Sequence, residues 1–181
     1  MALAIDMPGD VEESDLEPLW ASLVTFTELL GTRSQVRTIV FSDTVTLLPF
    51  SSALGRQSEF PQQLSRLVAN GDTKLLDALI LAYDELEDRG DGDHLQAVVI
   101  LTDGRDSTSS NSLEQVMWRI RHARDDGSDN IRFFAIAYGS DPDVELLTRL
   151  SEATGGRILY GRPDNITDVF VNIAAILLSG G

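Results

Sequence analysis

Four oxygen-bearing side chains stand in loops that are expected to adjoin the strands of a parallel sheet: Asp6, Asp10, Thr73 and Asp103. The two N-terminal acids follow the apolar run 2–5, and the last acid follows the β-branched run 97–101. In a doubly wound sheet, the loops beyond the carboxyl ends of the strands converge at one edge. Carboxylates and hydroxyls are ligands that Mg²⁺ and Ca²⁺ bind in proteins. Each residue taken alone is more often a helix cap or a turn residue, but together the four predict a divalent-cation site.

The patterns of common α/β enzymes are missing from the sequence. Only Gly9 stands where a dinucleotide fingerprint needs three glycines, and Gly71-Asp72-Thr73-Lys74 has the wrong order for a phosphate-binding P-loop. There is no Gly-x-Ser-x-Gly segment. His94 and His122 have no obvious Ser or Asp partner for nucleophilic catalysis. We therefore expect no enzyme, with a hydrolase of an unrecognised kind kept as an alternative.

The charge of the chain restricts its partners. Fourteen Lys and Arg residues against 29 Asp and Glu residues give a net charge of −15. A polyanion such as nucleic acid, or an anionic lipid surface, would be repelled by such a protein. A net negative charge favours basic partners and divalent cations. We expect no nucleic acid and no small-molecule substrate as partners.

The composition indicates one globular domain. Hydrophobic residues make up 43% of 181 residues and charged residues 24%, which excludes a disordered chain. The apolar stretch 173–178 is too short to span a bilayer, and residues 1–5 are too short for the apolar core of a signal peptide. No cysteine is present, so disulfide and thiol chemistry are excluded. We expect a single domain over residues 1–181, either a small protein or part of a longer one, with no direct membrane insertion and no assignable compartment.

The hydrophobic periodicity predicts alternating strands and helices. Helical spacing of apolar residues is found at 16–30, 57–68, 74–86, 113–120, 142–153 and 163–178. Strands are expected at 2–5, 97–101, 131–138 and 157–160, and a hairpin is expected from 35–41 and 44–50. Alternation of this kind predicts a three-layer α/β/α sandwich with a doubly wound, mostly parallel sheet. The loops that carry the four oxygen ligands then lie at one end of that sheet.

Five collinear segments resemble a von Willebrand factor type A (VWA) domain: 40–43, 71–79, 98–104, 133–140 and 153–160. They include Gly71-Asp72-Thr73 and Thr102-Asp103-Gly104 and cover nearly the whole chain. The resemblance is closest to the bacterial type A domains of multidomain, often membrane-associated proteins. It implies a Rossmann-like sheet of six strands, one of them an antiparallel edge strand, wrapped by helices.

The resemblance also implies a metal-ion-dependent adhesion site (MIDAS). In the family, Mg²⁺ is held by Asp-x-Ser-x-Ser after the first strand, a Thr from the second loop and an Asp after the fourth strand. A carboxylate of a protein partner completes the shell. By position, these ligands correspond to Asp6, Thr73 and Asp103.

The first of these segments departs from the family pattern. Pro8 and Asp10 stand where the family has serines. Pro8 has no side-chain oxygen, whereas Asp10 offers a carboxylate. Three carboxylates around a divalent cation leave a net charge of −1, which weakens its attraction for a further anion. We expect Asp103 and Asp6 to act through bound water, Thr73 directly, and Asp10 as a substitute direct ligand; we expect Asp106→Ala, unlike Asp103→Ala, to leave cation binding intact.

The expected function is an adhesion-type protein–protein interaction module with a degenerate divalent-cation site. Mg²⁺ is the expected ion, with Ca²⁺ and Mn²⁺ as alternatives. A protein partner would contact the loops at the top of the sheet, including residues 107–110 and 139–143. Two alternatives remain: a VWA scaffold that works without metal, and a structural subunit whose partner contacts a helix face.

Overall fold

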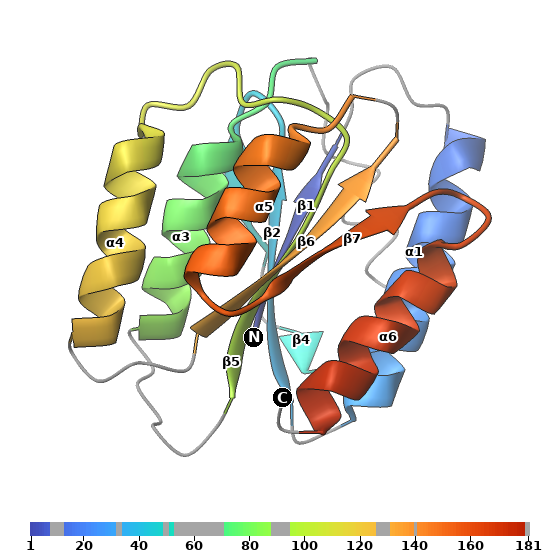
Figure 1. Ribbon diagram of the computed structural model, residues 1–181. Helices are drawn as coiled ribbons and strands as arrows, with labels where there is room; N and C mark the ends of the chain where they lie inside the picture. Colours follow the sequence, from blue (N-terminus) through green and yellow to red (C-terminus); the bar gives the residue numbers. More distant parts are fainter. Residues whose placement is uncertain are drawn as a thin grey trace.

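The computed structural model describes residues 1–7, 13–31, 34–48, 51–52, 71–87, 95–125, 131–139 and 141–179 (Figure 1). The helix expected at 57–68 lies outside these residues, as do Pro8, Asp10 and His94. The strands are β1 (Ala2–Asp6), β2 (Gln35–Phe41), β3 (Val45–Leu47), β4 (Ser51–Ser52), β5 (Gln96–Thr102), β6 (Ile131–Tyr138) and β7 (Arg157–Gly161). The helices are α1 (Glu13–Leu30), α3 (Leu75–Glu87), α4 (Leu113–Asp125), α5 (Val144–Ala153) and α6 (Ile166–Leu178).

Six of the strands form a sheet in the order β3-β2-β1-β5-β6-β7, and β4 pairs separately with β2. All neighbours from β2 to β7 are parallel, and β3 is antiparallel to β2. The register places Ile5 of β1 beside Val40 of β2 and Leu101 of β5. The predicted mostly parallel sheet of six strands with one antiparallel edge strand is confirmed.

The helices cover both faces of this sheet. The face under α3, α4 and α5 buries Val98 and Ile100 of β5, and the face under α1 and α6 buries Val99 and Leu101 (Figure 1). Successive side chains of a strand point to opposite faces, so an unbroken apolar run fills both layers of the core. This explains why β5 reads as a continuous hydrophobic segment.

Two helices begin two or more residues later than the periodicity predicted. The helix expected from 142 begins at Val144, because the side chain of Asp143 caps it and accepts a hydrogen bond from the N–H of Leu146 at 3.1 Å. The helix expected from 163 begins at Ile166. Before it, the Asn165 side chain accepts from the N–H of Arg162 at 2.7 Å, which makes residues 162–165 a turn.

The third predicted strand is shorter than expected. The sequence indicated 44–50, whereas β3 covers Val45–Leu47, and residues 49 and 50 lie outside the described part of the chain. Among the described helices, none combines the length and the apolar character needed to cross a bilayer.

Candidate functional site

The candidate site starts at the ends of two central strands. β1 ends at Asp6, and the neighbouring β5 ends at Thr102. The Thr102 hydroxyl donates a hydrogen bond to Oδ2 of Asp6 at 2.5 Å. Both side chains are buried, and Asp6 is only 2% exposed. The strand register therefore places a carboxylate inside the protein, at the edge where the parallel strands end.

The electrostatics of this carboxylate are unusual. Burial raises the pKa of Asp6 to about 7, against the hydrogen bond from Thr102 and with a further raising effect from the charge of Asp103. Burial also raises the pKa of Asp103. Two neighbouring carboxylates with raised pKa values are stabilised in their charged forms by a nearby cation.

Thr73 is held against the loop that follows β5. Its N–H donates to Oγ of Ser107 at 2.9 Å, and its carbonyl accepts from the N–H of Ser107 at 2.9 Å. The Thr73 side chain is buried, and a Cβ added to Gly104 would lie 3.3 Å from its Oγ1. The structure therefore brings together three of the four predicted site residues: Asp6, Thr73 and Asp103. The fourth, Asp10, lies outside the described residues.

Gly139 closes the site from the end of β6. Its φ is +80°, and a Cβ added there would lie 3.0 Å from the Cβ of Asp103. A left-handed backbone and a close approach both require glycine at this position. Gly139 thus leaves the space that the Asp103 side chain occupies.

Two acids to which the sequence assigned no part in the site tie α3 to the loop after β5. Oδ1 of Asp106 accepts from the N–H of Leu76 at 3.1 Å and from the hydroxyl of Ser109. In return, Asp77 accepts from the N–H groups of Ser110 and Asn111 at 3.0 and 2.9 Å. We call this reciprocal arrangement of Asp77 and Asp106 the α3 clamp. The sequence did show a loop of Asp, Ser, Thr and Asn after the strand 97–101. It did not show that this loop pairs with the start of α3, some 30 residues earlier in the chain.

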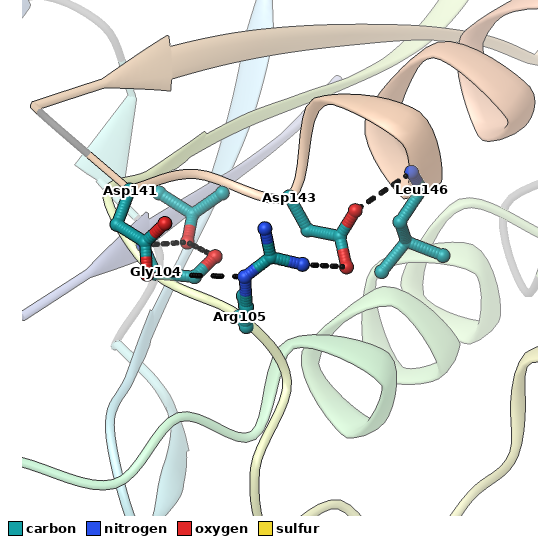
Figure 2. Close-up of polar contacts among 6 residues, drawn as sticks. Gly104, Arg105, Asp141, Asp143 and Leu146 are labelled. Atoms are coloured by element: carbon teal, nitrogen blue, oxygen red, sulfur yellow. Dashed lines mark hydrogen bonds and ion pairs between the residues drawn. The ribbon is translucent and has the colours of Figure 1, made fainter.

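Arg105 brings a positive charge to the rim of the site. Its Nη1 lies 3.2 Å from Oδ2 of Asp143 and its Nε 3.8 Å from Oδ2 of Asp141. Figure 2 shows the guanidinium between these two carboxylates, with the other oxygen of Asp143 directed at the backbone of Leu146. The Arg105 side chain is 60% exposed. The loop after β5 is thereby connected to the N-terminus of α5.

The donor set fits a hard cation, because it consists of oxygens only. The carboxylates of Asp6 and Asp103 and the hydroxyl of Thr73 are donors of the type that Mg²⁺ binds. Among the described residues, no group of three or more His, Cys, Asp and Glu side chains is placed to hold a metal ion. His122 lies on α4, where its Nδ1 contacts the carbonyl of Trp118 at 3.0 Å. Any cation here would therefore depend on hydroxyl, water or partner oxygens as well.

Comparison with protein families gives one match. Residues 1–169 match the family model of the von Willebrand factor type A domain. No sequence among the curated proteins matches the chain.

Solved structures with the same fold include three bacterial proteins. A von Willebrand factor type A protein from Catenulispora acidiphila has a TM-score of 0.72 at 18% identity, over 96% of this chain and 41% of that one. The pilus adhesin SpaC from Lactobacillus rhamnosus GG has a TM-score of 0.72 at 15% identity, over 97% of this chain and 30% of that one. The conserved hypothetical protein BatB from Bacteroides thetaiotaomicron has a TM-score of 0.70 at 14% identity, over 96% and 94%. The chain thus spans less than half the length of the first two.

Proposed function

Since the chain belongs to the von Willebrand factor type A family, we propose that it is a protein-binding module with an altered divalent-cation site at the carboxyl ends of β1 and β5. The observation that carries this proposal is the convergence of Asp6, Thr73 and Asp103. Two of these residues are carboxylates whose pKa values are raised by burial. Such a pair gains stability when a cation is bound, and it loses stability when both groups ionise without one.

The site residues would bind the ion in different ways. Thr73 would bind it directly through its hydroxyl, and Asp6 and Asp103 would act through bound water. Asp10 would provide a carboxylate where the family has a serine. Mg²⁺ is the expected ion, with Ca²⁺ and Mn²⁺ as alternatives. When bound, the cation would supply an electrophilic centre for a carboxylate of the partner, and the third carboxylate, Asp10, would weaken that attraction.

The partner would contact the loops around these residues. The loop 104–112 is fixed by the α3 clamp and by Arg105, so it presents a preformed surface. One of the structural neighbours, SpaC, is a pilus adhesin, which supports a protein partner for this fold. The net charge of −15 opposes nucleic acid. We assign no catalytic role to the site and no small-molecule substrate.

A calorimetric titration of metal-free protein with Mg²⁺, Ca²⁺ and Mn²⁺ tests the cation site. We expect heat and a raised melting temperature at millimolar metal, because a ligand that binds only the folded state stabilises it. Asp103→Ala should abolish both effects. Asp164→Ala removes an exposed acid before α6, so it has the same charge change and should leave them intact. No heat and no thermal shift with any of the three ions would contradict the cation site.

A metal-independent binding module is the second candidate, and the pKa of Asp6 favours it. With a pKa of about 7, Asp6 can hold a proton near neutral pH, so the carboxylate pair need not have a cation. Arg105 at the rim would then exchange its contacts with Asp141 and Asp143 for a carboxylate of the partner. Partner binding that persists in EDTA but is lost in Arg105→Ala would support this candidate over the first.

A further inference from the structure

Helix α4 lies at the edge of the molecule, away from the candidate cation site. Its apolar residues Val116 and Ile120 are buried in the core beneath it. In Figure 1, α3 lies on one side of α4, and no other described element lies on its outer side. The opposite face of the helix is exposed, including Gln115, Trp118 and Arg121.

Trp118 is the largest exposed apolar side chain on this face. It is 56% exposed. Its ring stacks on the ring of His122, with 3.9 Å between the centroids and 26° between the planes. His122 is in turn fixed by the contact of its Nδ1 with the Trp118 carbonyl at 3.0 Å. A rigid, exposed aromatic pair loses little conformational entropy on binding, and Trp is enriched among the residues that dominate interface energies.

The charge of α4 is opposite to that of the chain. The segment 113–125 carries three Arg residues against Glu114 and Asp125, in a chain with a net charge of −15. Arg119 is engaged with α3, where it contacts Asp84 at 2.6 Å and Glu87 at 2.7 Å. Arg121 is exposed, and none of the described acids forms an ion pair with it. Because Arg121 is three residues after Trp118, the two side chains are neighbours on the helix surface.

We propose that the face formed by Trp118, Arg121 and His122, which we call the α4 face, binds an acidic amphipathic segment of a protein partner. Acidic side chains of the segment pair with Arg121, and its apolar side chains pack on the Trp118–His122 stack. Charge complementarity selects this partner, because none of the acids that the structure describes neutralises Arg121. This surface requires no metal ion and is separate from the loops at the carboxyl ends of β1 and β5.

The probe for this surface is a fluorescein-labelled amphipathic helical peptide made of Glu, Leu and Ala. Binding to the full chain is measured by fluorescence anisotropy in EDTA, so that failure of the cation site does not affect the result. We expect Arg121→Glu and Trp118→Ala each to weaken binding about tenfold or more. Arg162→Glu makes the same charge change on an exposed residue between β7 and α6 and should alter affinity less than roughly twofold.

Three further readouts test whether the acidic peptide binds at the α4 face. Replacing every Glu of the peptide by Gln should weaken binding, and replacing every Glu by Lys should abolish binding. The indole N–H signal of Trp118, assigned with Trp118→Phe, should shift on addition of the acidic peptide. Absence of binding, or equal losses in Arg121→Glu and Arg162→Glu, would overturn the proposal. So would tighter binding of an RNA oligonucleotide, or self-association of the chain that Trp118→Ala abolishes.

Discussion

Asp6 and Asp103 are two acids close together, the first almost completely buried and the second partly buried. Each has a raised pKa because burial disfavours its charged form, and the charge of Asp103 adds to the shift of Asp6. The hydrogen bond from Thr102 only partly compensates. At neutral pH the pair therefore favours either a proton or a cation.

The pKa of Asp6 predicts a pH-dependent stability. Its folded-state pKa of about 7 lies above the usual value of 3.8, so between these limits the folded protein keeps a proton that the unfolded chain has lost. The stabilisation is complete below pH 4 and is lost as pH rises through 7. As pH rises from 4 to 7, the free energy of unfolding of the metal-free wild type should thus fall relative to that of Asp6→Asn, by at most on the order of 4 kcal/mol. Urea unfolding at pH 5, 6, 7 and 8 measures this, and identical pH profiles for the two proteins would contradict it.

Gly139 provides a second test at the residue scale. Gly139→Ala combines a positive φ with a contact of 3.0 Å to the Cβ of Asp103, whereas Gly155→Ala has a similar φ of +68° and nothing within 4 Å. Both substitutions should cost about 1–2 kcal/mol through the backbone. Only Gly139→Ala should also weaken cation binding, because Asp103 must move. Thermal unfolding and calorimetric titration of both variants check this, and equal effects on cation affinity would refute the role of Gly139.

At the scale of elements, the α3 clamp determines where Thr73 lies. Thr73 lies two residues before Leu75, where α3 begins, and the N–H of Leu76 in the first turn donates to Asp106 from another loop. The N-terminal N–H groups of a helix have no partner within the helix, so an acid from a distant loop both caps the helix and fixes its position. We therefore infer that Asp106, for which the sequence predicted no part in cation binding, positions Thr73.

Removing Asp106 should loosen this arrangement. Asp106→Ala leaves the N–H of Leu76 without its acceptor and should cost about 1–2 kcal/mol, with a loss of cation affinity as Thr73 shifts. Asp106→Asn keeps an acceptor oxygen and should restore most of both. Asp168→Ala, which removes an exposed acid from the first turn of α6, serves as the control. Equal stability of Asp106→Ala and Asp168→Ala would show that the clamp is dispensable.

The elements were predictable where local pattern decides structure. The continuous apolar run of β5 and the helical spacing of α3 indicated the type of each element and nearly correct ends. A strand buried on both faces is apolar throughout, whereas a helix buried on one face has apolar residues at helical spacing. The gathering of Asp6, Thr73 and Asp103 followed from the rule that ligands meet at the carboxyl ends of parallel strands. The α3 clamp and the link from Arg105 to Asp143 did not follow, since they join residues 30 to 38 apart through loop geometry.

At the scale of the whole molecule, a net charge of −15 produces self-repulsion in the folded state. Raising NaCl from about 50 mM to about 500 mM screens this repulsion and should raise the melting temperature. MgCl₂ at the same ionic strength should raise it further in wild type, and Asp103→Ala should remove only the excess. Differential scanning calorimetry checks this; an equal shift with the two salts in wild type would mean that Mg²⁺ acts by screening alone.

The most direct test of the cation site is a crystal structure of the chain grown with Mg²⁺. We predict an octahedral density peak about 2.0–2.1 Å from Oγ1 of Thr73, with waters that connect it to Asp6 and Asp103. An ordinary hydrogen-bonded water at that position, with no octahedral shell at saturating Mg²⁺, would contradict the account.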